Sequence, residues 1–109
     1  METFVRMNEK QITSAVINHW RACGLPKTLV ASIPNMRAMG QPGLTKGLAD
    51  LLVIAPGFVG FIELKTAKGR LSQAQKDFQY LCIVNGIPHS VCYGRDEPIE
   101  ILKHWKIVK

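Results

Sequence analysis

The chain has 109 residues, of which 47% are hydrophobic and 20% are charged, and these values fit one folded domain over residues 1–109 rather than a disordered chain. No apolar run approaches the ~18 residues that a membrane span requires, and the first residues do not resemble a secretory signal, so we expect a cytoplasmic protein without a membrane partner. The net charge of +6 indicates a polyanionic partner, which could be nucleic acid, a membrane surface or an acidic protein.

The first predicted element is a helix that begins after Asn8. Asn8 is a good N-cap, and Gln11 stands where a capping box requires it. Apolar residues recur at helical spacing from Ile12 to Cys23, after which a Gly-Leu-Pro sequence ends the helix. Glu9 falls on the same side as this apolar stripe. Its carboxylate is therefore placed either to reach a site on a neighbouring sheet or only to interact favourably with the helix dipole.

A β-rich run at residues 28–34 predicts the first strand, and residues 38–46 after it contain glycine and proline without apolar periodicity. This segment is predicted to be a loop. Arg37 and Lys46 flank it, so the loop either contacts phosphate groups or is an ordinary connection.

Two further strands are predicted at residues 51–55 and 58–64, and Pro56 and Gly57 between them indicate a hairpin. A short basic turn at residues 66–70 precedes a second helix, which Ser72 caps and Gly86 closes. A last strand at 90–93 is followed by a short helix or an extended tail at 96–105. The predicted order is therefore α-β-β-β-α-β with a C-terminal appendage, which is an α/β fold.

The predicted hairpin brings two acidic residues together. Asp50 stands at the head of its first strand and Glu63 near the end of its second, so an antiparallel pairing places them side by side. Because side chains alternate along a strand, Glu63 and Lys65 point to the same face. Two adjacent carboxylates repel each other and favour a bound cation, for which Mg²⁺ or Mn²⁺ are suitable because they prefer oxygen ligands.

With a divalent ion bound, Lys65 would meet an anion at the metal, and this combination is typical of phosphodiester hydrolysis. The alternative is that Asp50 is a polar strand start, while Glu63 and Lys65 form an exposed pair. The scarcity of acids supports the first interpretation. Between residues 3 and 76 the chain carries ten Lys and Arg residues, and its only acids there are Glu9, Asp50 and Glu63.

Cysteine and histidine do not suggest a different metal site. These residues are widely spaced and form no zinc-binding pattern, so we expect the cysteines to be reduced core residues. They are Cys23, Cys82, Cys92, His19, His89 and His104.

The chain resembles the PD-(D/E)xK nuclease superfamily and, more narrowly, the VRR-NUC (virus-type replication-repair nuclease) domain in its stand-alone phage or prophage form. The similarity extends from Glu9 to about Gly94. The chain departs from the superfamily pattern at Ala49, which stands where the superfamily name has proline, but this leaves Asp50 in place. The matching pieces are Glu9 and Ile12, Asn35, Gly47-Leu48-Ala49-Asp50-Leu51, Glu63-Leu64-Lys65, and Leu71-Ser72-Gln73-Ala74-Gln75 with Phe78, Leu81 and Gly86 after it.

The resemblance implies a restriction-endonuclease-like core, with a mixed sheet flanked by helices, and a role for each site residue. Glu9, Asp50 and Glu63 would bind Mg²⁺ or Mn²⁺, with the Leu64 carbonyl as a further ligand. Lys65 would orient or activate the attacking water. Gln75 would hold the water shell of the metal or the scissile phosphate. The residues expected to contact DNA are Arg37, Lys46, Lys68 and Arg70.

Relatives of this size act as homodimers on branched DNA, so the resemblance implies a structure-selective endonuclease that resolves Holliday junctions. Several alternatives stay open: the same site acting on flapped or single-stranded DNA or as a nicking nuclease, the same site acting on RNA, and a basic nucleic-acid-binding module whose acids are only structural. A dimer interface would use the first helix and Trp20, unless Trp20 is buried in its own core.

Overall fold

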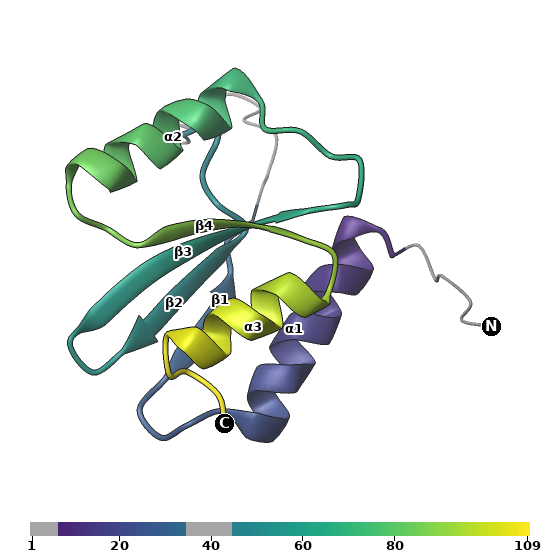
Figure 1. The fold of residues 1–109 in the computed structure, drawn as a ribbon, viewed down its shortest axis with the longest axis vertical. Coiled ribbons are helices and arrows are strands. Elements are labelled where there is room, and N and C mark those ends of the chain that lie inside the picture. The colour runs from purple at the N-terminus through teal and green to yellow at the C-terminus, as the bar shows by residue number, and fades with distance from the viewer. Residues whose placement is uncertain (1–6, 35–44) are drawn as a thin grey trace.

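The computed structural model describes residues 7–34 and 45–109 as a four-stranded sheet with helices on both sides (Figure 1). The strands lie in the order β1-β2-β3-β4. Their bounds, with those of the helices, are α1 Glu9–Cys23, β1 Leu29–Ser32, β2 Leu51–Ala55, β3 Phe58–Lys65, α2 Gln73–Val84, β4 His89–Tyr93 and α3 Asp96–His104.

The sheet is mixed, as the resemblance implies. β1, β2 and β3 pair antiparallel, whereas β3 and β4 are parallel and are connected through α2. A parallel pair requires a crossover connection, which is the role that α2 performs. The predicted order α-β-β-β-α-β is confirmed, and the C-terminal appendage is a helix.

Local sequence signals set several element boundaries. The β2–β3 hairpin turns at Pro56 and Gly57, and Gly57 adopts a positive φ of 70°. Both predicted caps are present: Asn8 forms a capping box with Gln11 at α1, and Ser72 caps α2. The first strand is shorter than predicted, because β1 ends at Ser32. Most of the predicted 38–46 loop lies outside the described residues.

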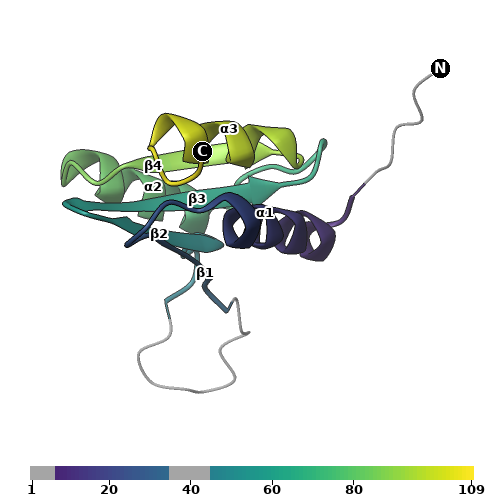
Figure 2. The same cartoon turned by 90° about the horizontal axis from the view of Figure 1, so that it is seen from below.

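The hydrophobic core lies on the α1 and α3 side of the sheet. Alternate residues of β2 and β3 point to this side, and Leu51, Val53, Ile62 and Leu64 are fully buried there against α1 and α3. Figure 2, seen from below, shows both helices in front of the sheet. Trp20 packs on this core, and its indole Nε1 donates to Thr28 Oγ1 at 3.0 Å, which favours the core alternative for this residue.

The three cysteines are free; Cys82 and Cys92 are buried as predicted, while Cys23 is partly exposed. None of the helices formed by residues 7–34 and 45–109 is long and apolar enough to cross a membrane.

Candidate active site

Glu63 and Lys65 lie at the end of β3 and point toward α2, away from the core. Both are buried, with exposed fractions of 1% and 7%. The Lys65 Nζ atom is 3.9 Å from Glu63 Oε1. The alternative of an exposed surface pair is therefore wrong, because α2 and the loop before it cover these side chains. Gly69 of that loop lies directly over Lys65, since a Cβ there would stand 3.1 Å from Lys65 Cδ.

Asp50 lies beside Glu63 through the register of the hairpin. Leu51 pairs with Ile62, so the next position outward on each strand places Asp50 opposite Glu63. The Asp50 carboxylate also accepts a hydrogen bond from the backbone N–H of Leu64, with a distance of 2.7 Å to Oδ2. This bond fixes one carboxylate oxygen of Asp50 at the end of β3.

Gln75 connects the helix to this pair. Its side-chain Oε1 accepts hydrogen bonds from the Ser72 backbone N–H at 2.8 Å and from Lys65 Nζ at 2.9 Å. Its Nε2 donates to Glu63 Oε1 at 2.9 Å. The capping box of α2 thus holds the amide that orients both Glu63 and Lys65. The structure brings together four of the predicted site residues: Asp50, Glu63, Lys65 and Gln75.

Gly47 contributes to this arrangement in a way that sequence reasoning did not assign. Its φ is +87°, and a Cβ on it would stand 2.3 Å from the backbone carbonyl of Ala74. Only glycine therefore permits the approach of this segment to the first turn of α2. The place of Gly47 in the Gly-Leu-Ala-Asp sequence was its only signal, because the close contact joins residues distant in the chain.

The electrostatics of Glu63 are those of a site prepared for a cation. Burial, followed by the proximity and negative charge of Asp50, raises the pKa of Glu63 to about 9, although Lys65 acts in the opposite direction. The Glu63 Oε2 atom is buried and has no hydrogen-bond partner. A buried oxygen without a partner costs free energy. A divalent cation bound between Glu63 and Asp50 would remove both costs, so this donor set fits Mg²⁺ or Mn²⁺.

Glu9 stands apart from this pair. It is the first residue of α1 and is exposed, but it is close enough for its charge to raise the pKa of Glu63. Across the residues that the structure describes, no group of three or more His, Cys, Asp or Glu side chains is gathered closely enough to hold a metal ion. The predicted trio is therefore a close pair, Asp50 and Glu63, with Glu9 nearby.

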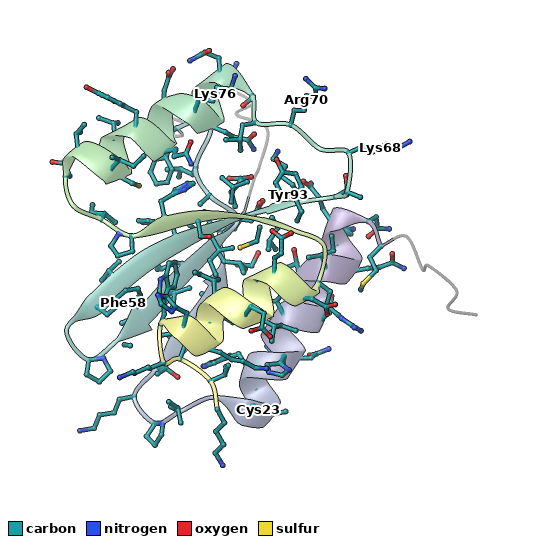
Figure 3. All side chains as sticks on the ribbon, in the orientation of Figure 1. Cys23, Phe58, Lys68, Arg70, Lys76 and Tyr93 are labelled. Carbon is teal, nitrogen blue, oxygen red and sulfur yellow. The ribbon has the colours of Figure 1, made fainter. Side chains whose placement is uncertain are left out.

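Exposed basic side chains lie on the segments that flank the site in the chain. Lys46, Lys68 and Arg70 are all exposed, and Lys76 is exposed in the first half of α2. Figure 3 shows Lys68 and Arg70 projecting outward from the loop before α2. Arg37 lies outside the described residues.

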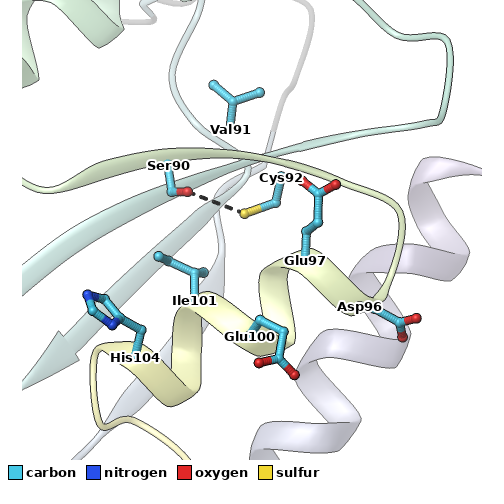
Figure 4. Close-up of a pocket in the computed structure, with 8 residues that line it drawn as sticks. All are labelled: Ser90, Val91, Cys92, Asp96, Glu97, Glu100, Ile101 and His104. Carbon is cyan, nitrogen blue, oxygen red and sulfur yellow. Dashed lines mark hydrogen bonds between the residues drawn. The ribbon is translucent and has the colours of Figure 1, made fainter.

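A pocket on the other side of the sheet is unrelated to this site. It lies between β4 and α3 and is lined by Ser90, Cys92 and Ile101 among others (Figure 4). The carboxylates of Asp96, Glu97 and Glu100 also line it. These negative charges would repel a phosphate backbone, so the pocket is not a plausible nucleic-acid site.

The mixed sheet, the crossover helix and the carboxylate pair beside a lysine have the arrangement that the resemblance to the PD-(D/E)xK core implies. The comparisons with known proteins identify the family. The chain matches the family model of the VRR-NUC domain over residues 2–96, and it belongs to this family. A solved structure described as a VRR_NUC domain is similar with a TM-score of 0.65, over 89% of this chain and 96% of that chain, at 20% sequence identity. No curated protein matches the chain.

Proposed function

We propose that the protein is a Mg²⁺- or Mn²⁺-dependent, structure-selective DNA endonuclease that acts as a homodimer on branched DNA such as Holliday junctions. The observation that carries this proposal is the buried carboxylate of Glu63, which lies opposite Asp50 in the hairpin. Its Oε2 has no hydrogen-bond partner, and its Oε1 is held by Gln75 and lies 3.9 Å from Lys65 Nζ. Membership of the VRR-NUC family supports hydrolysis of nucleic acid as the activity.

Asp50 and Glu63 would hold the cation, and the Leu64 carbonyl would assist them. The Leu64 N–H points to Asp50, and in an extended strand the carbonyl of the same residue points to the same side. Glu9 is proposed as a further carboxylate because its charge already acts on Glu63. When bound, the divalent ion supplies Lewis acidity, lowers the pKa of a water molecule and stabilises negative charge on the phosphate.

Lys65 would orient the attacking water and stabilise negative charge on the reacting phosphate. Its ammonium group is held by Gln75 Oε1 at 2.9 Å, so it is fixed before substrate arrives. Gln75 would also contact the scissile phosphate or the water around the cation. Because these groups are buried and held by hydrogen bonds, little reorganisation is needed at the moment of reaction.

The exposed basic residues Lys46, Lys68 and Arg70, with Arg37, would bind the DNA backbone around the site. Contacts with phosphate groups position a nucleic acid but do not read its sequence. This fits selectivity for the shape of DNA rather than for its bases.

A cleavage panel tests the proposal. Labelled four-way junction, flap, duplex, single-stranded DNA and RNA would be incubated with the protein in Mg²⁺, Mn²⁺ or EDTA. We expect metal-dependent cutting that is fastest on the junction. Asp50→Ala and Lys65→Ala should each reduce the rate at least ~100-fold, because each removes a charge that acts on the reacting phosphate, while DNA binding persists.

Matched substitutions on the opposite side of the sheet test whether the loss of cleavage is specific to the site or follows from removing any charged side chain. Asp96→Ala and Lys103→Ala remove the same charges from exposed positions on α3 and should leave the rate unchanged. Persistent cutting by both Asp50→Ala and Lys65→Ala would show that the site is elsewhere. DNA binding without cutting in any metal would favour the non-catalytic binding module.

A further inference from the structure

Two tyrosines are the exposed aromatic residues among residues 7–34 and 45–109, and they occupy different places in the fold. Tyr80 is 64% exposed and belongs to the second half of α2, away from Gln75. Tyr93 is 39% exposed and is the last residue of β4. The other aromatic side chains that the structure describes pack on the core or on one another. Tyr93 is therefore an exposed aromatic residue at the end of a strand, where nothing in the core requires it.

The register of the sheet places Tyr93 beside Lys65. The two residues are partners in the parallel pairing of β3 and β4, so their side chains point to the same face, on strands that lie about 5 Å apart. His89 shows which face this is, because it lies four residues earlier on β4 and its ring packs on Phe78 of α2. Tyr93 thus lies on the α2 side of the sheet, on the edge strand next to the strand that carries Glu63 and Lys65.

Hydrogen bonds hold the backbone around Tyr93. Its own N–H donates to Glu97 Oε1 at 3.0 Å, and the N–H of Gly94 donates to the carbonyl oxygen of Lys65 at 2.9 Å. A tyrosine side chain has few rotatable bonds, so a ring on a fixed backbone loses little conformational entropy on binding. Tyr93 is therefore suited to act as a preorganised platform for a flat ligand.

The groups around Tyr93 indicate that this ligand is a nucleotide. Lys65 is the cation proposed to meet the reacting phosphate, and Gly69 of the loop over it lies between two exposed basic residues, Lys68 and Arg70. Figure 3 shows Tyr93 at the same end of the molecule as these two side chains. A nucleobase is joined to its phosphate by one sugar, so a phosphate at Lys65 brings a base within reach of Tyr93. An aromatic ring beside basic groups is the combination with which proteins bind unpaired bases.

We propose that Tyr93 forms a nucleobase-binding subsite, in which its ring stacks on an unpaired base next to the phosphate that Lys65 meets. This inference deepens the proposed function and rests on it for the position of the phosphate. A base inside a duplex is stacked between its neighbours, and taking it out of the stack costs free energy. A base in a flap or another single-stranded segment avoids this cost. Tyr93 would therefore favour DNA with unpaired bases over continuous duplex, which phosphate contacts alone do not do.

DNA binding measured without cleavage tests the subsite. Fluorescence anisotropy in EDTA would give the Kd of two labelled DNAs, a flapped duplex and the same duplex with abasic sites throughout its flap. The second DNA keeps the phosphates and sugars of the flap but lacks its bases. We expect the unmodified protein to bind the first DNA about 10-fold more tightly than the second. Tyr93→Ala should weaken binding of the flapped duplex by a similar factor and bind both DNAs with similar Kd, because the ring and the base form one contact.

Further variants separate stacking from other effects of the substitution. Tyr93→Phe keeps the ring and should bind the flapped duplex as the unmodified protein does. Tyr80→Ala removes a more exposed tyrosine away from the site and should leave both affinities unchanged. Circular dichroism and thermal unfolding would verify that each variant is folded. If Tyr93→Ala does not fold, Tyr93→Leu would replace it, because leucine covers the edge of the sheet without offering a flat aromatic face.

Equal losses of affinity on removal of the bases, in the unmodified protein and in Tyr93→Ala, would overturn the proposal. Weak binding by Tyr93→Phe, or an unmodified protein that does not distinguish the two DNAs, would also overturn it. If no metal supports cleavage but the ring and the base are coupled as expected, the proposed function fails and the subsite stands. If cleavage depends on metal but Tyr93→Ala binds the flapped duplex normally, the subsite fails and the proposed function stands.

Discussion

The two sides of the sheet differ in kind. On the α1 and α3 side, Ile62 and Leu64 of β3 are buried in a continuous apolar core. On the α2 side, Glu63 and Lys65 of the same strand are buried among polar groups, and several large apolar residues toward the hairpin end are exposed. Because neighbouring residues of a strand point to opposite faces, one strand serves both sides.

The apolar core therefore lies on the α1 and α3 side of the sheet, whereas the candidate active site lies on the α2 side. The first side is complete within one chain and supplies the free energy of folding through apolar burial. The second side contains a carboxylate oxygen without a partner and apolar residues without cover. In the proposed function, the carboxylate pair at one end of this face would bind a cation.

Substitutions at two adjacent residues of β3, one on each face of the sheet, give the largest expected difference between the two sides. Ile62→Ala should lower the free energy of unfolding by about 2–5 kcal/mol, because it leaves a cavity in the core. For a domain of this size that lowers Tm by about 10 °C or more. Glu63→Gln should not lower the stability at pH 7 without metal, since the folded protein must hold a proton on Glu63 there and the amide needs none, but it should abolish cleavage.

Thermal unfolding and cleavage per folded molecule would be measured for both variants. The division of roles between the two sides would be contradicted if Ile62→Ala unfolded at the same temperature as the unmodified protein, or if Glu63→Gln cut DNA at the normal rate.

A smaller effect is expected at Gln75, where a structural and a chemical role coincide. Gln75→Ala removes the α2 capping-box amide and its contacts with Glu63 and Lys65. We expect cleavage to fall about 10–100-fold, as for residues that orient metal ligands, with a loss of roughly 1 kcal/mol in stability.

Gln11 offers a matched control for this prediction, because it occupies the same capping-box position in α1 without touching the site. Gln11→Ala should cost the same stability and leave the cleavage rate unchanged. Equal cleavage rates for Gln75→Ala and Gln11→Ala would mean that Gln75 is only a cap.

Short-range signals in the sequence predicted much of this arrangement. The Pro56 and Gly57 turn predicted the hairpin, and the hairpin register placed Asp50 beside Glu63. Ser72 predicted the start of α2, which brought Gln75 close to the end of β3. These features depend on turn and capping preferences that act over a few residues.

The features that sequence did not predict depend on contacts between distant segments. The burial of Lys65 depends on how α2 and its loop fold over the sheet, and the role of Gly47 depends on its approach to Ala74. Phe78 and Leu81 of α2 were both identified, but periodicity could not separate Phe78, which packs on Phe61, from Leu81, which is exposed. Both kinds of residue are apolar at helical spacing.

The last expected effect concerns the pH dependence of stability on the α2 side. Burial and Asp50 raise the pKa of Glu63 from the ordinary 4.5 to about 9 in the folded protein without metal. Between these values the folded state holds a proton that the unfolded state releases, so this contribution is fully present below pH 4.5 and is lost as the pH rises toward 9. Tm should therefore fall more across this range in the unmodified protein than in Glu63→Gln, as thermal unfolding in EDTA would measure.

The fall of Tm with pH and its removal by metal would together connect the protonation of Glu63 to the metal site. Because binding of a cation requires ionised Glu63, saturating Mg²⁺ or Mn²⁺ should stabilise the unmodified protein more strongly as the pH rises and cancel the fall in Tm. Glu63→Gln has no such proton to release, so its Tm should respond less to metal at every pH. Identical profiles for the two proteins, with and without metal, would show that the buried carboxylate of β3 neither holds the proton nor binds the cation.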